Sequence, residues 1–198
     1  MINPQRLFER LAQEDVEIVL VGGVAMIAHG IPHVTNDIDL CYRRDPGNMD
    51  RLIRAIASLN PRLRVEGLTD DQSRALPFQF DRHTLRATES LTLTTDIGGV
   101  DLLARVSGLG DYENVRRLAT LTNFSGITIP ILSLTGLIEN KRAAARDKDL
   151  AALPQIEATL RVQQERVART HIASEPASHA RQTLLEGPRQ PNGEVPDL

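Results

Sequence analysis

The pattern of apolar and polar positions predicts alternating helices and strands over the first sixty residues. Leu7 and Leu11 recur at helical spacing behind Asn3-Pro4, a favourable helix start. The run from Val16 to Val21 is almost continuously apolar and rich in β-branched residues, which is typical of a strand buried on both faces. By the same reasoning we expect a short helix over 24–29, a strand over 38–42 and an amphipathic helix over 48–59.

The middle of the chain favours strands. Leu91–Thr95 and Val100–Leu103 flank the sequence Asp96-Ile97-Gly98-Gly99, which predicts a hairpin. Residues 127–132 predict another strand, and Pro130 within it indicates an edge of the sheet because proline lacks an amide hydrogen. Between residues 62 and 86 the pattern is weak, and we expect only short strands near 64–65 and 78–80.

The C-terminal third predicts helices followed by a tail. Asp111 caps a helix that ends near Leu118, Ser133 caps one that runs through Ala145, and a third spans about 147–170. Pro154 is expected to break or kink that third helix. We predict a mixed α/β (α+β) sheet core over 1–132, helices packed on it over 133–172, and a proline-containing disordered tail over 173–198.

Composition limits the function classes. Hydrophobic residues make up 41% and charged residues 25% of the 198 residues, a balance typical of globular domains. The net charge of −3 gives no general attraction to nucleic acid, so a DNA-binding regulator gains no support. The single cysteine, Cys41, excludes an internal disulfide. The N-terminal segment is charged throughout and no apolar run approaches a membrane span, so we expect a cytoplasmic protein without a membrane partner.

A glycine pair follows the first predicted strand. Gly22-Gly23 stands between that strand and a short predicted helix, where backbone amides can approach a phosphate closely. A tight turn required only for packing explains the same pair, and on its own that interpretation is favoured.

Two carboxylates begin the next predicted strand. Asp37 and Asp39 are two residues apart and therefore point to one face, while Ile38 and Leu40 point to the other. Adjacent carboxylates repel each other unless a cation lies between them, and oxygen-only ligands favour Mg²⁺ or Mn²⁺. A solvated strand that happens to carry two acids is the alternative.

Together these features resemble the nucleotidyltransferase superfamily that includes kanamycin nucleotidyltransferase, the CCA-adding enzymes and DNA polymerase beta. The resemblance rests on Gly22-Gly23-Val24-Ala25 and, beginning at Gly30, on the sequence GIPHVTNDIDL. It is closer to the small bacterial branch of AbiEii-type toxins, in which a glycine-glycine pair precedes the sequence TxDIDL. It is strong over about residues 16–42 and weaker over 88–153.

The resemblance implies a site and a reaction. It implies that Asp37, Asp39 and Asp101 bind the metal and carry catalysis, and that Gly22, Gly23, Val24 and Lys141 contact the nucleotide. Asp101 would orient or deprotonate the acceptor; its alternatives are a plain hairpin residue and the rival acid Asp96. Lys141 is alternatively one charge of a solvated helix, and Arg146 with Asp149 is expected to form a structural pair.

The implied activity is transfer of a nucleoside monophosphate from an NTP such as ATP to RNA (tRNA included), protein or a small molecule, with Mg²⁺ or Mn²⁺ as cofactor. A toxin with an antitoxin partner is one form of it. Two departures favour the alternative, a catalytically weakened nucleotide- or partner-binding module of the same fold. Val24 stands where many relatives carry serine, and His33 stands where the branch usually carries arginine.

Overall fold

The computed structural model describes residues 2–124 and 126–174. Its centre is a seven-stranded sheet in the order β3-β4-β5-β2-β1-β9-β8. The strands are β1 (Ile18–Val21), β2 (Asp37–Tyr42), β3 (Arg62–Leu63), β4 (Ser90–Thr95), β5 (Gly98–Leu103), β8 (Ala119–Phe124) and β9 (Ile127–Leu132). A separate two-stranded ribbon pairs β6 (Arg105–Val106) with β7 (Gly110–Asp111).

The sheet mixes strand directions. β2 runs parallel to β5, and β1 runs parallel to β9, whereas β1 with β2, β3 with β4, β4 with β5, and β8 with β9 are antiparallel. All four residues of β1 are buried, as the apolar run predicts. The hairpin over residues 90–103 is confirmed, with Thr95 paired to Gly98 across the two-residue turn.

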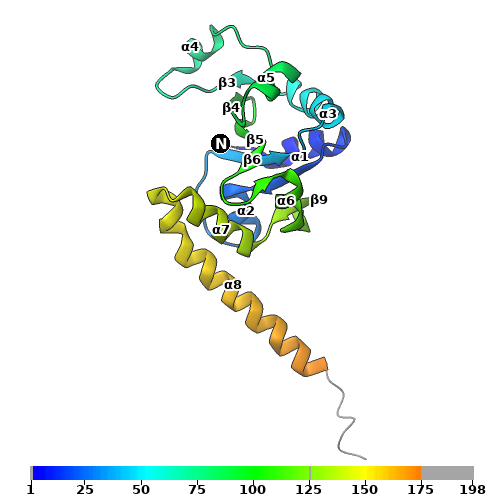
Figure 1. The fold of residues 1–198 in the computed structure, drawn as a ribbon, viewed down its shortest axis with the longest axis vertical. Helices are drawn as coiled ribbons and strands as arrows, with labels where there is room; N and C mark the ends of the chain where they lie inside the picture. The colour runs from blue at the N-terminus through cyan, green and yellow to red at the C-terminus, as the bar shows by residue number, and fades with distance from the viewer. Residues whose placement is uncertain (1, 125, 175–198) are drawn as a thin grey trace, which may run out of the picture. The chain divides into compact units, whose positions relative to one another are not determined.

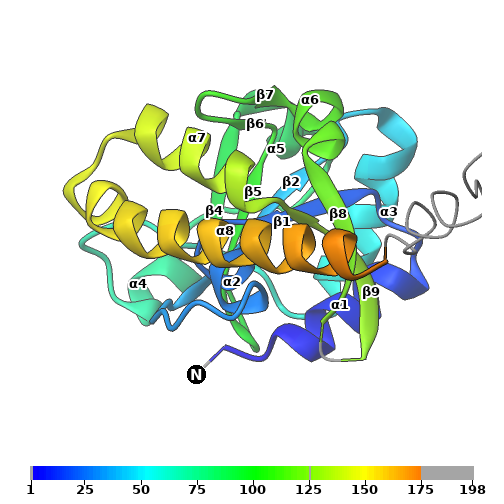
Figure 2. The same cartoon turned by 90° about the horizontal axis from the view of Figure 1, so that it is seen from below.

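The described residues also form helices. They are α1 (Pro4–Gln13), α2 (Gly22–Ala28), α3 (Pro46–Ala57), α4 (Asp70–Arg74), α5 (Arg82–Ala87), α6 (Tyr112–Arg117), α7 (Leu134–Ala144) and α8 (Asp147–Ser174). Figure 1 shows α1 beside α3, and α2 beside α7, in agreement with their contacts. Figure 2 shows the ribbon of β6 and β7 side by side, close to α6. None of the helices described is long and apolar enough to cross a membrane.

Most of the predicted elements are confirmed, and their caps explain their bounds. The side chains of Asn3, Asp45, Asp111 and Ser133 each accept a hydrogen bond from a backbone amide in the first turn of α1, α3, α6 and α7. Asp45 moves the start of α3 to Pro46, two residues earlier than the pattern alone predicts.

Several expectations are wrong. No strand forms at residues 78–80; that stretch is irregular and lies between two short helices, α4 and α5. The strand expected near Arg64 is β3, two residues earlier. Residues 127–132 form an inner strand, because β8 covers their outer side. Pro130 is tolerated there since β9 meets β1 at a single register pair, Leu20 with Ile131.

The C-terminal segment was predicted only in part. α8 is one uninterrupted helix with Pro154 inside it, so the proline does not break it. The expected tail begins within this helix at residues 173–174, and residues 175–198 lie outside the described part of the chain. One compact unit ends at Arg161 and a second begins at Val162, so α7 and the first half of α8 belong to the same unit as the sheet.

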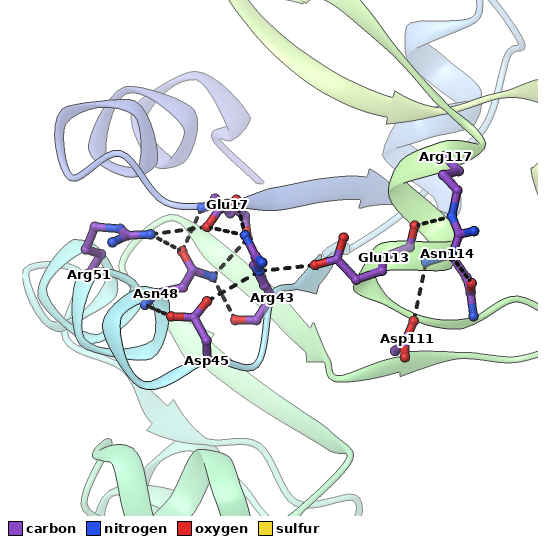
Figure 3. Close-up of polar contacts among 9 residues, drawn as sticks. All are labelled: Glu17, Arg43, Asp45, Asn48, Arg51, Asp111, Glu113, Asn114 and Arg117. Atoms are coloured by element: carbon purple, nitrogen blue, oxygen red, sulfur yellow. Dashed lines mark hydrogen bonds and ion pairs between the residues drawn. The ribbon is translucent and has the colours of Figure 1, made fainter.

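A polar network fixes α3 against the sheet on the side shown in Figure 3. Asn48 is fully buried; its Oδ1 accepts from the Glu17 amide at 2.7 Å, and its Nδ2 donates to the carbonyls of Glu17 at 3.0 Å and Arg43 at 2.8 Å. Arg43 also pairs with Glu17 at 3.0 Å and, from α6, with Glu113 at 3.1 Å. One buried amide therefore joins the start of β1 to the end of β2.

Candidate active site

The glycine pair lies at the junction of β1 and α2. Gly22 has a φ of +65°, a conformation that favours glycine. A methyl group at Gly22 would lie 2.6 Å from Asp39 Cγ, and one at Gly23 would lie 2.9 Å from the His33 ring. The backbone therefore lies directly against Asp39 at Gly22 and against His33 at Gly23, with no room for a further side chain. This is the packing role expected of such a turn.

The three aspartates lie on two adjacent strands. Ile38 and Leu40 are fully buried, whereas Asp37 and Asp39 are partly exposed, as the alternation in β2 predicts. β2 and β5 are parallel, and their register pairs Asp39 with Asp101 and Asp37 with Gly99. Neighbouring strands are separated by about 4.8 Å, so Asp39 and Asp101 stand side by side.

The rival acid lies elsewhere. Asp96 is in the hairpin turn, where its Oδ2 accepts a hydrogen bond from Asn60 at 2.5 Å and its Oδ1 lies 3.8 Å from Arg62. It does not line the cleft described below.

The crowding of carboxylates changes their protonation. Burial, together with the negative charges of Asp101 and Asp37, raises the pKa of Asp39 to about 7, although Lys141 and a hydrogen bond from the Gly23 amide act in the opposite direction. Burial also raises the pKa of Asp101; Arg64 opposes this shift and Asp37 adds to it. The ionised form of these acids is disfavoured in the absence of a cation, and a bound cation would stabilise it.

Arg64 is a member of this cluster that sequence reasoning missed. Its Nη2 lies 2.9 Å from Asp101 Oδ1 and 3.3 Å from Asp37 Oδ2, so a single nitrogen bridges two of the three acids. The surrounding pattern from 62 to 86 gives no clear signal, and only the pairing of β3 with β4 places Arg64 here. Two hydroxyls also contact the acids: Thr35 donates to Asp37 at 2.9 Å, and Thr92 donates to Asp101.

Apart from Arg64, these groups line one cleft of about 570 Å³. The glycine pair, the three aspartates and Lys141 line it together. Its other lining residues are Val21, His33, Thr35, Glu89, Ser90, Thr92, Leu103, Arg105, Val106, Ser107, Asn140, Ala144, Arg146 and Lys148. Of the residues that the resemblance implies for the site, only Val24 does not line this cleft; its side chain is buried in the core.

Lys141 is held in place by a buried acid. Its Nζ lies 2.6 Å from Asp149 Oδ1, and Arg146 Nε lies 2.5 Å from Asp149 Oδ2. Burial by itself would raise the pKa of Asp149, but the hydrogen bonds from Arg146 and Lys141 outweigh it, and the pKa is lowered. The structural pair expected between Arg146 and Asp149 is present, and Asp149 also fixes the position of Lys141, which lines the cleft.

His33 and Cys41 differ in their relation to the cleft. His33 borders it, and burial with the nearby Lys141 and Lys148 lowers the pKa of its ring, which favours the neutral form. Cys41 is fully buried in the core away from the cleft, and burial raises the pKa of its thiol to about 12. The cysteine therefore behaves as a small apolar residue.

The carboxylates of the cleft fit a divalent cation in their chemistry but are not arranged as a ready-made site. Within residues 2–124 and 126–174, no three His, Cys, Asp or Glu side chains form a ready-made metal-ligand group. Arg64 instead supplies the positive charge at Asp37 and Asp101. The oxygen-only chemistry of the three carboxylates and the raised pKa of Asp39 still fit Mg²⁺ or Mn²⁺.

The fold is shared with known nucleotidyltransferases. The crystal structure of ANT(2'')-Ia in complex with adenylyl-2''-tobramycin matches with a TM-score of 0.50 and 12% identity, over 86% of this chain and 95% of that chain. The solution structure of the antibiotic-resistance factor ANT(2'')-Ia gives a TM-score of 0.49 at 11% identity, over 86% and 94% of the two chains. A Thermotoga maritima protein described as a nucleotidyltransferase gives 0.45 at 17% identity, over 88% and 97%.

The likeness to the crystal structure of ANT(2'')-Ia defines the class of fold. At 12% identity it shows the fold alone, a nucleotidyltransferase-like mixed sheet flanked by helices, and this confirms the fold class expected from the sequence. At the level of sequence, no family model matches the chain and no curated protein is significantly similar to it. The branch of AbiEii-type toxins remains a prediction.

Proposed function

We propose that the protein is a divalent-cation-dependent nucleotidyltransferase that transfers a nucleoside monophosphate from an NTP to an acceptor and releases pyrophosphate. The observation that carries the proposal is the juxtaposition of Asp39 and Asp101 on paired strands beside the Gly22-Gly23 turn, all on one cleft. The fold shared with ANT(2'')-Ia, a protein captured with an adenylylated aminoglycoside, supports the same class of reaction.

Each acidic side chain has a role in this proposal. Asp37 and Asp39 would hold Mg²⁺ or Mn²⁺, with Asp101 as a further ligand. The bound cation would supply a positive charge to the phosphates of the NTP and lower the cost of charge that develops during transfer. Asp101 would also accept the proton of the acceptor hydroxyl. The hydroxyl oxygen would then bond to the α-phosphorus while the bond from the α-phosphorus to the pyrophosphate oxygen breaks.

The remaining cleft residues would bind the triphosphate. The backbone at Gly22, Gly23 and Val24 would approach the phosphates, because both glycines line the cleft and carry no side chain there. Lys141, fixed by Asp149, would contribute a positive charge at the cleft that it lines. Most of the catalytic effect would come from positioning and electrostatics rather than from covalent chemistry.

A transfer assay tests the proposal. The purified protein is incubated with each α-labelled NTP, ATP included, together with Mg²⁺ and separate pools of RNA, protein and small-molecule acceptors. We expect label to move to one pool, and to do so at least about 100-fold more slowly in Asp39→Asn, which keeps the shape of the side chain but removes its charge. Equal transfer by both proteins would contradict the proposal.

The second candidate is a nucleotide- or partner-binding module of the same fold. Val24 favours it, because its buried apolar side chain stands where a phosphate-binding hydroxyl is common in the resembled family. Nucleotide binding that persists in Asp39→Asn, without transfer by either protein, would support this candidate.

The resemblance to AbiEii-type toxins extends the proposal to a toxin with an antitoxin partner. Induced expression of the wild-type chain is then expected to arrest bacterial growth, whereas expression of Asp39→Asn is not. Growth arrest by both proteins at equal levels would separate toxicity from the proposed reaction.

A further inference from the structure

We infer that Arg64 is a built-in counter-ion that holds Asp37 and Asp101 together in the cation-free protein and must leave them when a divalent cation binds. The inference rests on the proposed function, because the cation is the one proposed to bind these acids. It assigns to Arg64 a role as a positioning residue that competes with the cation and so sets the affinity of the site.

The first observation is the geometry of the bridge. One nitrogen, Nη2, lies 2.9 Å from Asp101 and 3.3 Å from Asp37. Such charge-assisted contacts engage the same carboxylate oxygens that a cation would need as ligands. A guanidinium cannot lose its proton in a protein, so Arg64 cannot make room by becoming neutral and has to move.

The second observation is the space that the guanidinium occupies. A methyl group at Gly99 would lie 2.6 Å from Arg64 Nη1 and 3.2 Å from Asp37 Cβ. Gly99 is the register partner of Asp37, so the absence of a side chain at this position leaves the guanidinium room beside Asp37. The bridge is therefore accommodated by the packing of β5 and is not a chance surface contact.

The third observation is that Arg64 is free to leave. It directly follows β3, a two-residue strand at the edge of the sheet, and its own amide donates to the Thr92 carbonyl at 2.9 Å. Its side chain is about one third exposed, at 34%, while Asp101 is 19% exposed. The arginine side chain can thus turn towards solvent while the backbone keeps its pairing with β4.

Asp39 does not share this bridge. The positive charges near it belong to Lys141 and Arg146, and the Gly23 amide donates a hydrogen bond to it. Of the three acids, Asp39 is thus the one that Arg64 leaves available, and we expect a cation to contact it before the bridge at Asp37 and Asp101 opens.

Titration with Mn²⁺ alone tests the inference. Binding is measured by calorimetry and by the paramagnetic resonance signal of free Mn²⁺ for the wild type, Arg64→Gln and Arg64→Ala. We expect the variants to bind Mn²⁺ about tenfold more tightly, within the usual range for two ligands that compete through one site. Two variants are used because one of them alone can lose stability when Asp37 and Asp101 lack their counter-ion.

Arg62→Gln is the matched control. Arg62 lies two residues away, in β3, and its Nη1 is 3.8 Å from Asp96 in the hairpin turn. Its removal changes the net charge by the same amount without opening the bridge, so its Mn²⁺ affinity should stay within about twofold of the wild type. A second measurement is the melting temperature: Mg²⁺ should raise it more in Arg64→Gln than in the wild type.

The outcomes are distinguishable. Unchanged or weaker Mn²⁺ binding in both Arg64 variants, with normal binding by the wild type that is lost in Asp39→Asn, would overturn the inference and leave the proposed function intact. An equal gain in affinity in Arg62→Gln would overturn it as well, because general charge would then explain the effect. No Mn²⁺ binding by any of the proteins would overturn the inference together with the metal site.

Discussion

Replacing Gly22 with alanine tests the contact between the glycine turn and Asp39. The new methyl group would lie 2.6 Å from Asp39 Cγ and closer still to Oδ2, and the residue would keep a φ of +65°. The backbone conformation costs alanine about 1–2 kcal/mol, and the steric overlap adds about 1–3 kcal/mol. The smaller entropy of the unfolded alanine chain returns about 0.4–1 kcal/mol. We therefore expect a net loss of about 1–5 kcal/mol, with a central value of about 3 kcal/mol.

Gly30→Ala is the matched control for this change. Gly30 has a φ of +81°, but a methyl group there would have no neighbour within 4 Å. It carries the same backbone strain and the same entropy gain without the overlap, so we expect a loss of only about 1 kcal/mol. The difference between the two variants in urea unfolding, at equal slopes, measures the overlap with Asp39.

A double-mutant cycle completes the test. Asp39→Ala removes the carboxyl group and leaves only its Cβ, 3.0 Å from the new methyl. In that background Gly22→Ala should cost at least about 1 kcal/mol less than in the wild type, because the groups that overlapped are gone. Equal losses for Gly22→Ala and Gly30→Ala, or an unchanged loss in the Asp39→Ala background, would refute the packing described for this turn.

Three further changes are expected to alter stability in defined ways. With EDTA present, the free energy of unfolding of the wild type should fall by about 2–3 kcal/mol between pH 5 and pH 7 relative to that of Asp39→Asn. The pKa of Asp39 is raised to about 7 in the folded state, whereas the unfolded chain ionises near pH 4, so ionisation above pH 4 disfavours folding. Parallel pH profiles of the two proteins in urea unfolding would contradict this. Asn48→Asp should cost about 3 kcal/mol in urea unfolding at pH 7, because a carboxylate oxygen would then face the Glu17 and Arg43 carbonyls; a loss below 1 kcal/mol would mean that these contacts are not important. Asp149→Ala should cost about 3–5 kcal/mol, because Lys141 would lose its partner at a largely buried position, and Asp149→Asn should cost less; equal losses for the two would contradict the pairing.

The sequence predicts the centre of the fold well because periodicity and caps act locally there. β1 is a continuous apolar run, β2 alternates, and the hairpin of β4 and β5 has a two-residue turn. β8 was missed: two of its six residues, Thr120 and Leu121, are exposed in succession, so it lacks a clean apolar alternation, and it forms through pairing with β9. The edge prediction for Pro130 failed for the same reason, since the sequence does not show which strand lies outside it.

The candidate site was predictable as far as it is encoded in short motifs. Asp37 and Asp39 follow from strand alternation, and Asp101 from the resemblance with its place in a strand beside a turn. Arg64 and Thr92 were not predictable, because they reach the acids only through the pairing of β3, β4 and β5. The pairing of Lys141 with Asp149 requires the chain to turn between α7 and α8. Ala145 makes this turn in a left-handed conformation, which the sequence does not predict because alanine rarely adopts it.

Diffraction from crystals soaked with Mn²⁺ and a non-hydrolysable ATP analogue, at a wavelength where Mn²⁺ scatters anomalously, tests the central claim most directly. The account predicts an anomalous peak about 2.0–2.2 Å from carboxylate oxygens of Asp37 and Asp39, with Arg64 turned away from both acids. A peak at another place, or nucleotide bound in the cleft with Arg64 still bridging Asp37 and Asp101 and no peak between the acids, would contradict it.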